Sequence, residues 1–386
     1  MNLPASFTEY TRALLGVEEY EKLVSALQQE PPVSIRLNRL KVHRLKVENA
    51  LSVQPPWSSE GIYLDERLTF TFDPLFHAGC YYVQEASSMF VEQVLRQHVT
   101  KPVVMLDLCA APGGKSTHAR SVLPEGSLLV ANEVIRNRSQ ILAENLTKWG
   151  HPDVVVTNND PADFSALPSF FDVILTDVPC SGEGMFRKDP VAVEEWSPEN
   201  VEICWQRQRR IIADIWDALK PGGILIYSTC TFNTKEDEEN ARWIQQEYGA
   251  EPLTVQVQEN WNITGDLLPD NCDGSKSSIP VYHFFPHKTK GEGFFLAAFR
   301  KPETGDEIPV SSFSKEKTSK KKDKKGGAAS SPVSKEQLNI AKSWLNDENS
   351  DKYILSAEGT SIRAFSKHYA DELMAMKQCL KIVSAG

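Results

Sequence analysis

The sequence lacks the cysteine spacings that mark disulfide scaffolds and zinc sites. Its seven cysteines are odd in number and include no C-x-x-C pair, so we expect neither a disulfide framework nor a metal site. No apolar run approaches the ~20 residues that a membrane span requires. The first twenty residues carry Glu9, Glu18 and Glu19 and no apolar core segment, so no signal peptide is expected. We therefore expect a cytoplasmic protein without a metal or a membrane partner.

Positive charge is also in short supply. The chain has 42 Lys and Arg against 52 Asp and Glu, a formal net charge of −10, which argues against a protein that coats nucleic acid through bulk charge. Local basic patches are not excluded. The 386 residues are 41% hydrophobic and 24% charged, a composition and length that predict two or three globular domains.

The stretch VVMLDLCAAPGGKST, residues 103–117, organises the rest of the chain. Residues 103–108 form a short apolar run rich in β-branched side chains, which predicts a buried strand. The small residues at 109–114 predict a tight loop, and the residues from Lys115 onward predict a helix. A strand, a small-residue loop and a helix together form a backbone platform for a nucleotide-like ligand.

Three ligand classes use such a platform, and an ordinary turn without a ligand is a fourth alternative. Dinucleotide enzymes require G-x-G-x-x-G, which the sequence A-A-P-G-G-K does not match. A P-loop requires G-x-x-x-x-G-K followed by Ser or Thr, but its first glycine would fall on Cys109. S-adenosylmethionine (SAM) carries no phosphate and needs only close backbone approach. The loop alone does not decide among these alternatives.

After this stretch, strands alternate with helices, which predicts a doubly wound α/β sheet that binds ligands at the carboxyl ends of its strands. Glu133 follows the second strand, about 20 residues after the glycines, where a carboxylate accepts hydrogen bonds from ribose hydroxyls. Asp160 follows the third strand, and it either accepts the amine of an adenine or belongs to a turn. The predicted strands are 103–108, 127–132, 153–157, 171–176, 224–227 and 293–300, and the main helices are 136–149 and 199–219.

Two cysteines follow neighbouring strands, Cys180 in the segment that begins at Asp177 and Cys230 after Ser-Thr. A structural cysteine is usually buried and inert, so either one alone favours simple packing. Two thiols beside a carboxyl group suggest methylation of a pyrimidine at C5. That carbon becomes nucleophilic only after a thiolate adds at C6 and an acid neutralises the charge at N3. Spacing alone does not order the two cysteines.

Cations gather in a few local runs. Residues 34–47 carry five cations and no acid. Most charge runs are solvated faces, but in an acidic protein this run also fits a phosphate backbone. Gln84 and Ser87 lie near the start of a predicted helix. Their side chains either cap this helix or face a ligand. Seven lysines in 315–325 predict a basic flexible linker.

Eight segments match, in order, the motifs of one enzyme family. They are SIRLNRLK, YYVQEASSM, LDLCAAPGGKSTHA, NEVIRNR, DVILTDVPCSGEGMFRKDP, RQRRII, LIYSTCTFNTKEDEEN and PHKTKGEGFFLAAF. Over residues 34–300 the chain resembles the Sun/Nop family of RNA (cytosine-5) methyltransferases. The segments GMFRKDP and GEGFFLA are most similar to its bacterial RsmF-like subgroup, which methylates 16S ribosomal RNA.

The resemblance implies a class I SAM-dependent methyltransferase fold, SAM as cofactor and 16S rRNA or the small ribosomal subunit as partner. Cys230 is the implied nucleophile, Cys180 helps to release the product, and Asp177 lies between cofactor and base. The implied cofactor site comprises Cys109, Ala110, Ala111, Pro112, Gly113, Gly114, Lys115, Glu133, Arg138, Asp160 and Asp177. Around a base that has left its stack, the expected RNA contacts are Arg36, Arg39, Lys41, Gln84, Ser87, Arg187, Lys188 and Arg207.

Four regions are expected along the chain. Residues 1–100 form a helical and small α+β RNA-binding domain, 101–302 the methyltransferase domain, 303–333 the basic linker, and 334–386 the start of a PUA-like RNA-binding domain. The family carries a fuller C-terminal region, so the chain is expected to be shortened there. A tRNA-directed methyltransferase of the same family and a non-catalytic RNA-binding assembly factor remain alternatives.

Overall fold

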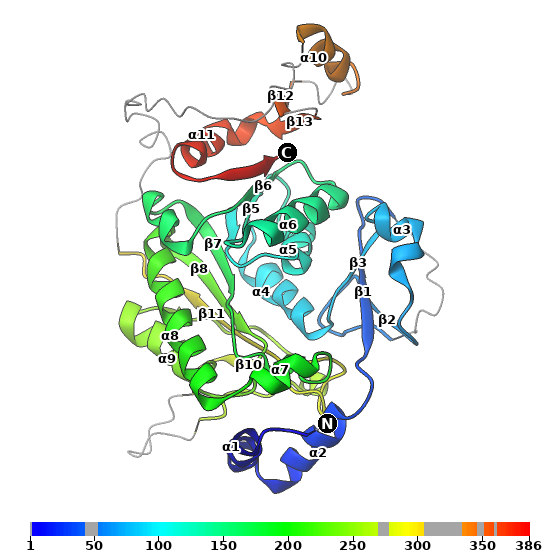
Figure 1. Ribbon diagram of the computed structural model, residues 1–386. Coiled ribbons are helices and arrows are strands. Elements are labelled where there is room, and N and C mark those ends of the chain that lie inside the picture. The colour runs from blue at the N-terminus through cyan, green and yellow to red at the C-terminus, as the bar shows by residue number, and fades with distance from the viewer. Residues whose placement is uncertain (1, 43–52, 269–277, 305–333, 346–350, 359–360) are drawn as a thin grey trace.

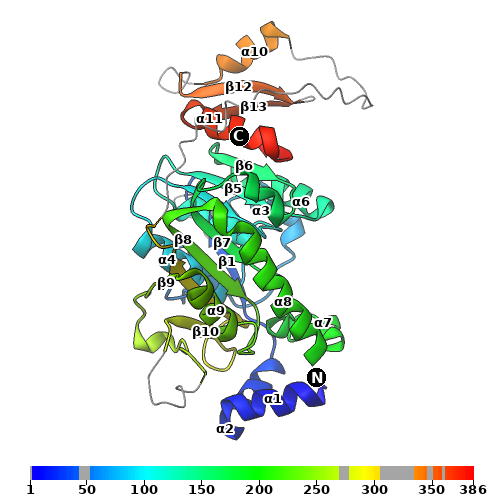
Figure 2. The ribbon, with the colours of Figure 1, turned by 90° about the vertical axis from the view of Figure 1, so that its left-hand side faces the viewer.

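The computed structural model describes residues 2–42, 53–268, 278–304, 334–345, 351–358 and 361–386. Two N-terminal helices lie at one end of the molecule, a large central sheet lies in the middle, and the C-terminal elements lie at the other end (Figures 1 and 2). The predicted basic linker falls almost entirely outside the described residues, as do Arg44 and Lys46 of the N-terminal cation run.

The N-terminal part contains two helices and a small antiparallel sheet. The predicted helical region 3–29 is divided at Gly16, whose φ of +80° suits glycine. The small sheet lies beside the central sheet (Figure 1), with β1 paired to both β2 and β3. The elements are α1 (Ala5–Leu15), α2 (Val17–Leu27), β1 (Val33–Leu37), β2 (Gly61–Leu64), α3 (Pro74–His77), β3 (Tyr81–Val83) and α4 (Val91–His98).

The central sheet confirms the predicted doubly wound α/β fold. Its order is β10-β11-β8-β7-β4-β5-β6-β14, and the run from β8 to β6 is parallel. Its strands before residue 301 are β4 (Val104–Asp107), β5 (Leu128–Asn132), β6 (Val154–Thr157), β7 (Phe171–Asp177), β8 (Leu219–Thr229), β9 (Glu251–Pro252), β10 (Val281–Phe284) and β11 (Phe294–Arg300). Its helices are α5 (Gly114–Val122), α6 (Arg136–Trp149), α7 (Pro190–Glu195), α8 (Pro198–Ile215) and α9 (Glu238–Tyr248).

Alternate residues of the strands face two separate cores. In β4, Leu106 packs in the cluster that holds α8 and α9, whereas the neighbouring Met105 packs in the cluster that holds α4, α5 and α6. Both side chains are fully buried. Helices on both faces of a parallel sheet bury its strands completely, which explains why these strands are continuous apolar runs in the sequence.

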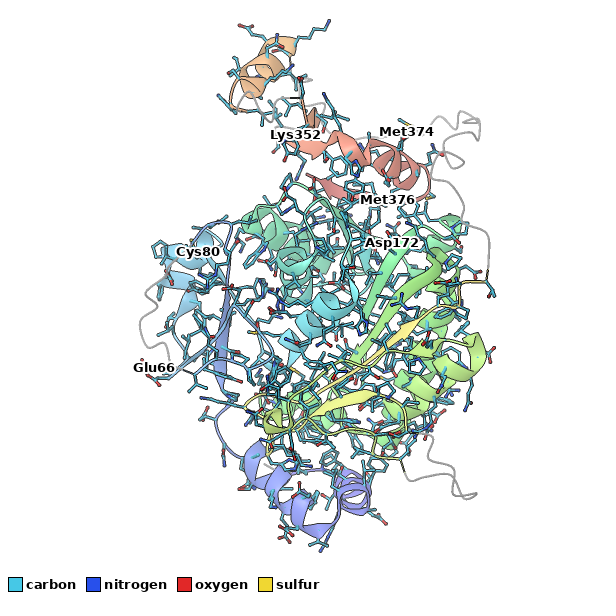
Figure 3. All side chains as sticks on the ribbon, turned by 180° about the vertical axis from the view of Figure 1, so that it is seen from behind. Glu66, Cys80, Asp172, Lys352, Met374 and Met376 are labelled. Carbon is cyan, nitrogen blue, oxygen red and sulfur yellow. The ribbon has the colours of Figure 1, made fainter. Side chains whose placement is uncertain are left out.

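The C-terminal residues complete one edge of the central sheet. Strand β14 pairs antiparallel with β6, and the preceding helix buries Met376 against the sheet while Met374 remains exposed (Figure 3). Trp344, which follows the helix that begins at Lys335, is 77% exposed. The elements are α10 (Lys335–Lys342), β12 (Tyr353–Glu358), β13 (Ser361–Ser366), α11 (Ala370–Cys379) and β14 (Ile382–Ala385). That residues 334–386 begin a PUA-like domain stays a prediction.

Candidate active site

The order of the strands reverses between β4 and β7, and we call the position beyond the carboxyl ends of these two strands the crevice. The chain runs from β4 outward through β5 to β6, and then returns to form β7 on the opposite side of β4. The loops that follow β4 and β7 therefore separate at this point, which is where doubly wound sheets bind ligands. The predicted cofactor loop follows β4, and the segment with Cys180 follows β7.

The predicted cofactor loop is fixed by hydrogen bonds to its backbone. Arg138 donates from Nη2 to the carbonyl of Ala111 at 2.9 Å, and Asn145 donates to the carbonyl of Pro112 at 2.8 Å. Gly113 has a φ of +116°, a conformation that L side chains rarely adopt, and it caps α5. Two side chains from α6 thus hold a small-residue loop whose turn requires glycine.

Acidic side chains follow the next two strands, as predicted. Glu133 is buried, and its carboxylate accepts from the backbone N–H of Ile135 at 2.8 Å and lies 3.4 Å from Arg138. Asp160 is exposed and accepts from the N–H of Ala162 at the start of a 3-10 turn. The contacts of Asp160 are therefore those of a turn residue, one of the two predicted alternatives. A hydrogen bond from Asp160 to the adenine of SAM stays a prediction.

Lys115 and Asp177 form an ion pair across the crevice. Nζ of Lys115 lies 2.8 Å from Oδ2 of Asp177, and Ser228 donates to the other carboxylate oxygen at 2.9 Å. Burial alone would lower the pKa of Lys115, but the charge and the hydrogen bond of Asp177, together with the charge of Asp107, raise it. Because Lys115 is engaged by a carboxylate, it is not directed at a phosphate, which weakens the P-loop alternative further.

The two cysteines predicted to carry the chemistry meet in this site. The Sγ atoms of Cys180 and Cys230 lie 3.0 Å apart, and both cysteines are free thiols. The hydrogen bond with Cys230 and burial raise the pKa of Cys180 well above its usual range. Loops that are 50 residues apart in sequence therefore bring two thiols together.

Three buried carboxyl groups of the site were missed by the sequence analysis. The sequence predicts a helix that is capped by Asn233 and Thr234 and has Glu236 and Asp237 in its first turn. In the structure α9 begins only at Glu238, and both acids precede it and are buried. Burial raises the pKa of Glu236, and it raises the pKa of Glu183 to about 7. In the sequence, only their position close to the two cysteine motifs could have indicated that these acids belong to the site. Acids that follow a glycine or precede a helix are common on protein surfaces, so their residue type gave no further indication.

Arg36 has to be corrected as an RNA contact, because its side chain is fully buried. It donates from Nε to Gln84 at 2.8 Å and from Nη2 to Thr117 at 2.6 Å, and its guanidinium lies 4.4 Å from the ring centre of Trp149. Arg36 therefore ties β1 to α5 and α6 rather than facing solvent.

Three further predicted RNA contacts are also buried. Gln84 accepts from Arg36, and Ser87 donates to the carbonyl of Glu292 at 3.1 Å. Arg187 pairs with the carboxylate of Glu292 at 3.0 Å and has a side chain only 5% exposed. Each polar group is satisfied by a partner distant in sequence, so none of them is free to hold a phosphate.

The other predicted RNA contacts lie nearer the surface. Arg39 pairs with Glu60, Lys41 donates to the carbonyl of Ala78 at 2.6 Å, and Arg207 is exposed on α8. Lys188 lies 3.6 Å from Glu292 with 30% of its side chain exposed. Whether these cations contact RNA stays a prediction.

A cleft of about 1240 Å³ lies between the small N-terminal sheet and segment 286–291. Gln84 lines it and also lies beside Gly114, where an added Cβ would contact the Gln84 side chain at 3.9 Å. The cleft therefore adjoins the predicted cofactor loop. Its lining includes the cations Arg67, Arg187, Lys188, Lys288 and Lys290 and the acids Glu30, Asp65, Glu66 and Glu85.

The described residues lack two further features. None of their helices is sufficiently long and apolar to cross a membrane. In the same part of the chain, no three His, Cys, Asp or Glu side chains are grouped so as to hold a metal ion.

Solved structures share this fold. NSun6 from Pyrococcus horikoshii with SFG superposes with a TM-score of 0.65 at 23% identity, covering 77% of this chain and 98% of that one. A methyltransferase homologue protein from the same organism gives a TM-score of 0.63 at 26% identity, covering 78% of this chain and all of that one.

Curated relatives are more similar in sequence. Ribosomal RNA small subunit methyltransferase F of Pectobacterium atrosepticum is 36% identical over 321 residues, and that of Serratia proteamaculans is 36% identical over 317. The matches cover 80% and 78% of this chain, but only 64% and 63% of the relatives' length.

Family models cover most of the chain that lies before the predicted linker. The N-terminal domain of 16S rRNA methyltransferase RsmF matches residues 3–86, and 16S rRNA methyltransferase RsmB/F matches residues 91–300. The second match spans more than half of the sequence and contains the crevice, the ion pair and both cysteines. The chain therefore belongs to the RsmB/F family of 16S rRNA methyltransferases.

Proposed function

We propose that the protein transfers a methyl group from SAM to C5 of a cytosine in RNA, with 16S ribosomal RNA as its substrate. The observation that carries this proposal is the 3.0 Å approach of the Cys180 and Cys230 thiols. Asp177 and Lys115 pair within the same site at 2.8 Å. Membership of the RsmB/F family supports the reaction class and the choice of RNA.

The residues around the crevice fit SAM, which would supply an electrophilic methyl group. The loop at 109–113 has small side chains, so a ligand can approach its backbone closely. Glu133 stands at the tip of β5, where a carboxylate suits the hydroxyls of a ribose, and Arg138 supports both Glu133 and the loop. Asp160 is assigned to the adenine. None of these contacts requires a phosphate.

Cys230 is assigned as the nucleophile. Its thiolate attacks C6 of the cytosine and forms an Sγ–C6 bond, while a proton from the Lys115–Asp177 ion pair, which Nζ of Lys115 carries, neutralises the charge that develops at N3. The C5 carbon thereby becomes nucleophilic and accepts the methyl group. A base in the site then takes the C5 proton, the C5=C6 double bond forms again, and the Sγ–C6 bond breaks to release the Cys230 thiolate. Cys180 is assigned to assist this release.

The RNA is proposed to approach along the cleft beside the cofactor loop. Lys188, Lys288 and Lys290 line this cleft and supply positive charge close to the site. The target base must leave its stack to reach the cysteines. A substrate in the small ribosomal subunit implies a cytoplasmic location.

The test is transfer of labelled methyl from SAM to RNA. The purified protein would be incubated with 16S rRNA, with small ribosomal subunits and with bulk tRNA, and the digests analysed for 5-methylcytosine. We expect label in 5-methylcytosine of 16S rRNA, free or assembled. Label in tRNA alone would keep the reaction and change the substrate. Measurable SAM binding without label in any RNA would favour the non-catalytic assembly factor.

A further inference from the structure

We propose that Glu183 and Glu236 are positioning residues that lock the two cysteine loops together. This inference rests on the proposed function, because it concerns how Cys180 and Cys230 are held for that reaction. Each glutamate belongs to one cysteine loop and accepts hydrogen bonds from the backbone of the other. We call this pair of contacts the reciprocal clamp.

Glu183, three residues after Cys180, reaches the loop of Cys230. Its Oε2 accepts from the backbone N–H of Phe232 at 2.6 Å and of Asn233 at 3.0 Å. Its Oε1 accepts from the Asn233 amide and from Nε1 of Trp196, each at 3.0 Å. The carboxyl group is fully buried and faces four donors, so both of its oxygens accept hydrogen bonds.

Glu236, six residues after Cys230, reaches in the opposite direction. It accepts from the backbone N–H of Ser181, the residue after Cys180, at 3.0 Å. Gln208 of α8 donates to the same carboxylate at 2.6 Å and also to the carbonyl of Pro179 at 3.0 Å. Glu236 and Gln208 therefore fix the backbone on both sides of Cys180.

Two further contacts close the reciprocal clamp. The side-chain amide of Asn233 donates to Glu183 at 3.0 Å and to Glu236 at 2.9 Å, so one group joins both glutamates. The N–H of Gly184 donates to the carbonyl of Cys230 at 2.7 Å. A Cβ at Gly184 would lie only 2.7 Å from that carbonyl oxygen, so the close approach of the loops requires glycine.

The donors explain why an isosteric replacement should fail. Glutamine has the shape of glutamate, but its NH₂ group would face N–H donors in place of an acceptor oxygen. A buried donor without an acceptor is costly, so the two loops would separate locally. The distance between the two thiols would then vary, and their alignment on one base would be lost.

The experiment compares Glu183→Gln and Glu236→Gln with wild type in glutathione redox buffer, without RNA or SAM. As an Sγ–Sγ bond forms between Cys180 and Cys230, the two thiols pass their hydrogens to oxidised glutathione, which becomes two reduced glutathiones. The fraction of linked peptide, measured by mass spectrometry, reports how often the thiols meet. We expect the equilibrium constant for linkage to fall at least ~10-fold in each variant. Cys180→Ala identifies the linked peptide.

Glu202→Gln is the matched control. Glu202 lies on α8 and pairs with Lys235 of the same cysteine loop, but its side chain is 38% exposed. We expect linkage and methylation like wild type in this variant. In Glu183→Gln and Glu236→Gln, by contrast, we expect unchanged SAM affinity and a methylation kcat at least ~10-fold lower. This result would show that the reciprocal clamp acts on the cysteines rather than on overall folding.

Linkage as efficient as wild type in both folded glutamine variants would overturn the proposal. Should either variant fail to fold, Asn233→Ala, which removes the shared donor and leaves both carboxylates, is expected to give the same loss of linkage. Normal linkage in Asn233→Ala would then overturn it. Linkage of Cys180 to Cys230 needs neither RNA nor SAM. If the glutamine variants lose linkage as expected but the wild-type protein methylates no RNA, the reciprocal clamp stands and only the proposed function is refuted.

Discussion

Lys115 at the start of α5 and Asp177 at the end of β7 form an ion pair of 2.8 Å that spans the crevice of the central sheet. Lys115 follows the predicted cofactor loop, and Asp177 lies three residues before Cys180. The pair therefore connects the part of the site assigned to SAM with the part assigned to the base. It also orients Asp177, whose second oxygen accepts from Ser228 at 2.9 Å.

Replacing Lys115 by methionine should lower kcat/KM for methylation by ~10- to 100-fold, which corresponds to about 1.4–3 kcal/mol. Removing one partner of a fully buried ion pair lowers the free energy of unfolding by about 3–5 kcal/mol. We expect the Lys115–Asp177 contact to be weaker than that, because the Asp177 side chain is 33% exposed. Steady-state kinetics would measure the change. The control is Lys101→Met, an exposed lysine just before β4. Equal activity of both variants would show that the pair does not orient Asp177.

Replacing Arg36 by alanine should destabilise the fold by about 3 kcal/mol, within the range for large-to-small changes at buried sites. The change leaves Gln84 without its donor and removes the contact with Trp149. Urea unfolding would measure the loss.

The same variant distinguishes a structural from an RNA-binding role. The salt dependence of RNA binding by folded Arg36→Ala should match wild type, whereas loss of a phosphate contact lowers the slope by about one. Arg207→Ala, at an exposed position of α8, is the comparison. A reduced slope for Arg36→Ala would contradict the assignment of Arg36 to the fold.

His118 should make the protein more sensitive to acid. It is buried and donates to Glu92 at 2.9 Å, and burial lowers its pKa from 6.5 to about 4. Below about pH 6.5 the unfolded chain binds a proton that the folded protein does not, so stability falls as the pH falls. Between about pH 6.5 and pH 5 this amounts to about 2 kcal/mol.

The measurement is urea unfolding of wild type and His118→Asn across this pH range. We expect the difference in unfolding free energy between the two proteins to shrink as the pH falls. Parallel curves would mean that His118 is protonated in the folded protein as readily as in the unfolded chain.

The strands and helices of the central sheet were largely predictable. The helix predicted at 136–149 coincides with α6 (Arg136–Trp149), and the strand predicted at 171–176 differs from β7 by one residue. Strands buried on both faces are continuous apolar runs, and such runs are visible in sequence. The helix predicted at 199–219 ends at Ile215 in the structure, and β8 already begins at Leu219.

The polar interior was not predictable in the same way. The sequence pattern places Arg36 with its neighbours in a basic surface run, although Gln84 and Thr117 accept its hydrogen bonds in the interior. The burial of Glu183 and Glu236 was likewise not predictable, because the groups that donate hydrogen bonds to them come from loops about 50 residues away. Sequence pattern shows which faces are apolar, but it does not show which distant segments supply a partner to a buried charge.

The central claim, that the paired thiols perform covalent catalysis, is tested most directly by trapping the enzyme on its RNA. Wild type, Cys230→Ala and Cys180→Ala would be incubated with SAM and 16S rRNA, and the products separated under denaturing conditions. We predict no methylation and no adduct for Cys230→Ala, and an accumulated covalent protein–RNA adduct for Cys180→Ala. An adduct or methylation that persists in Cys230→Ala would contradict the account.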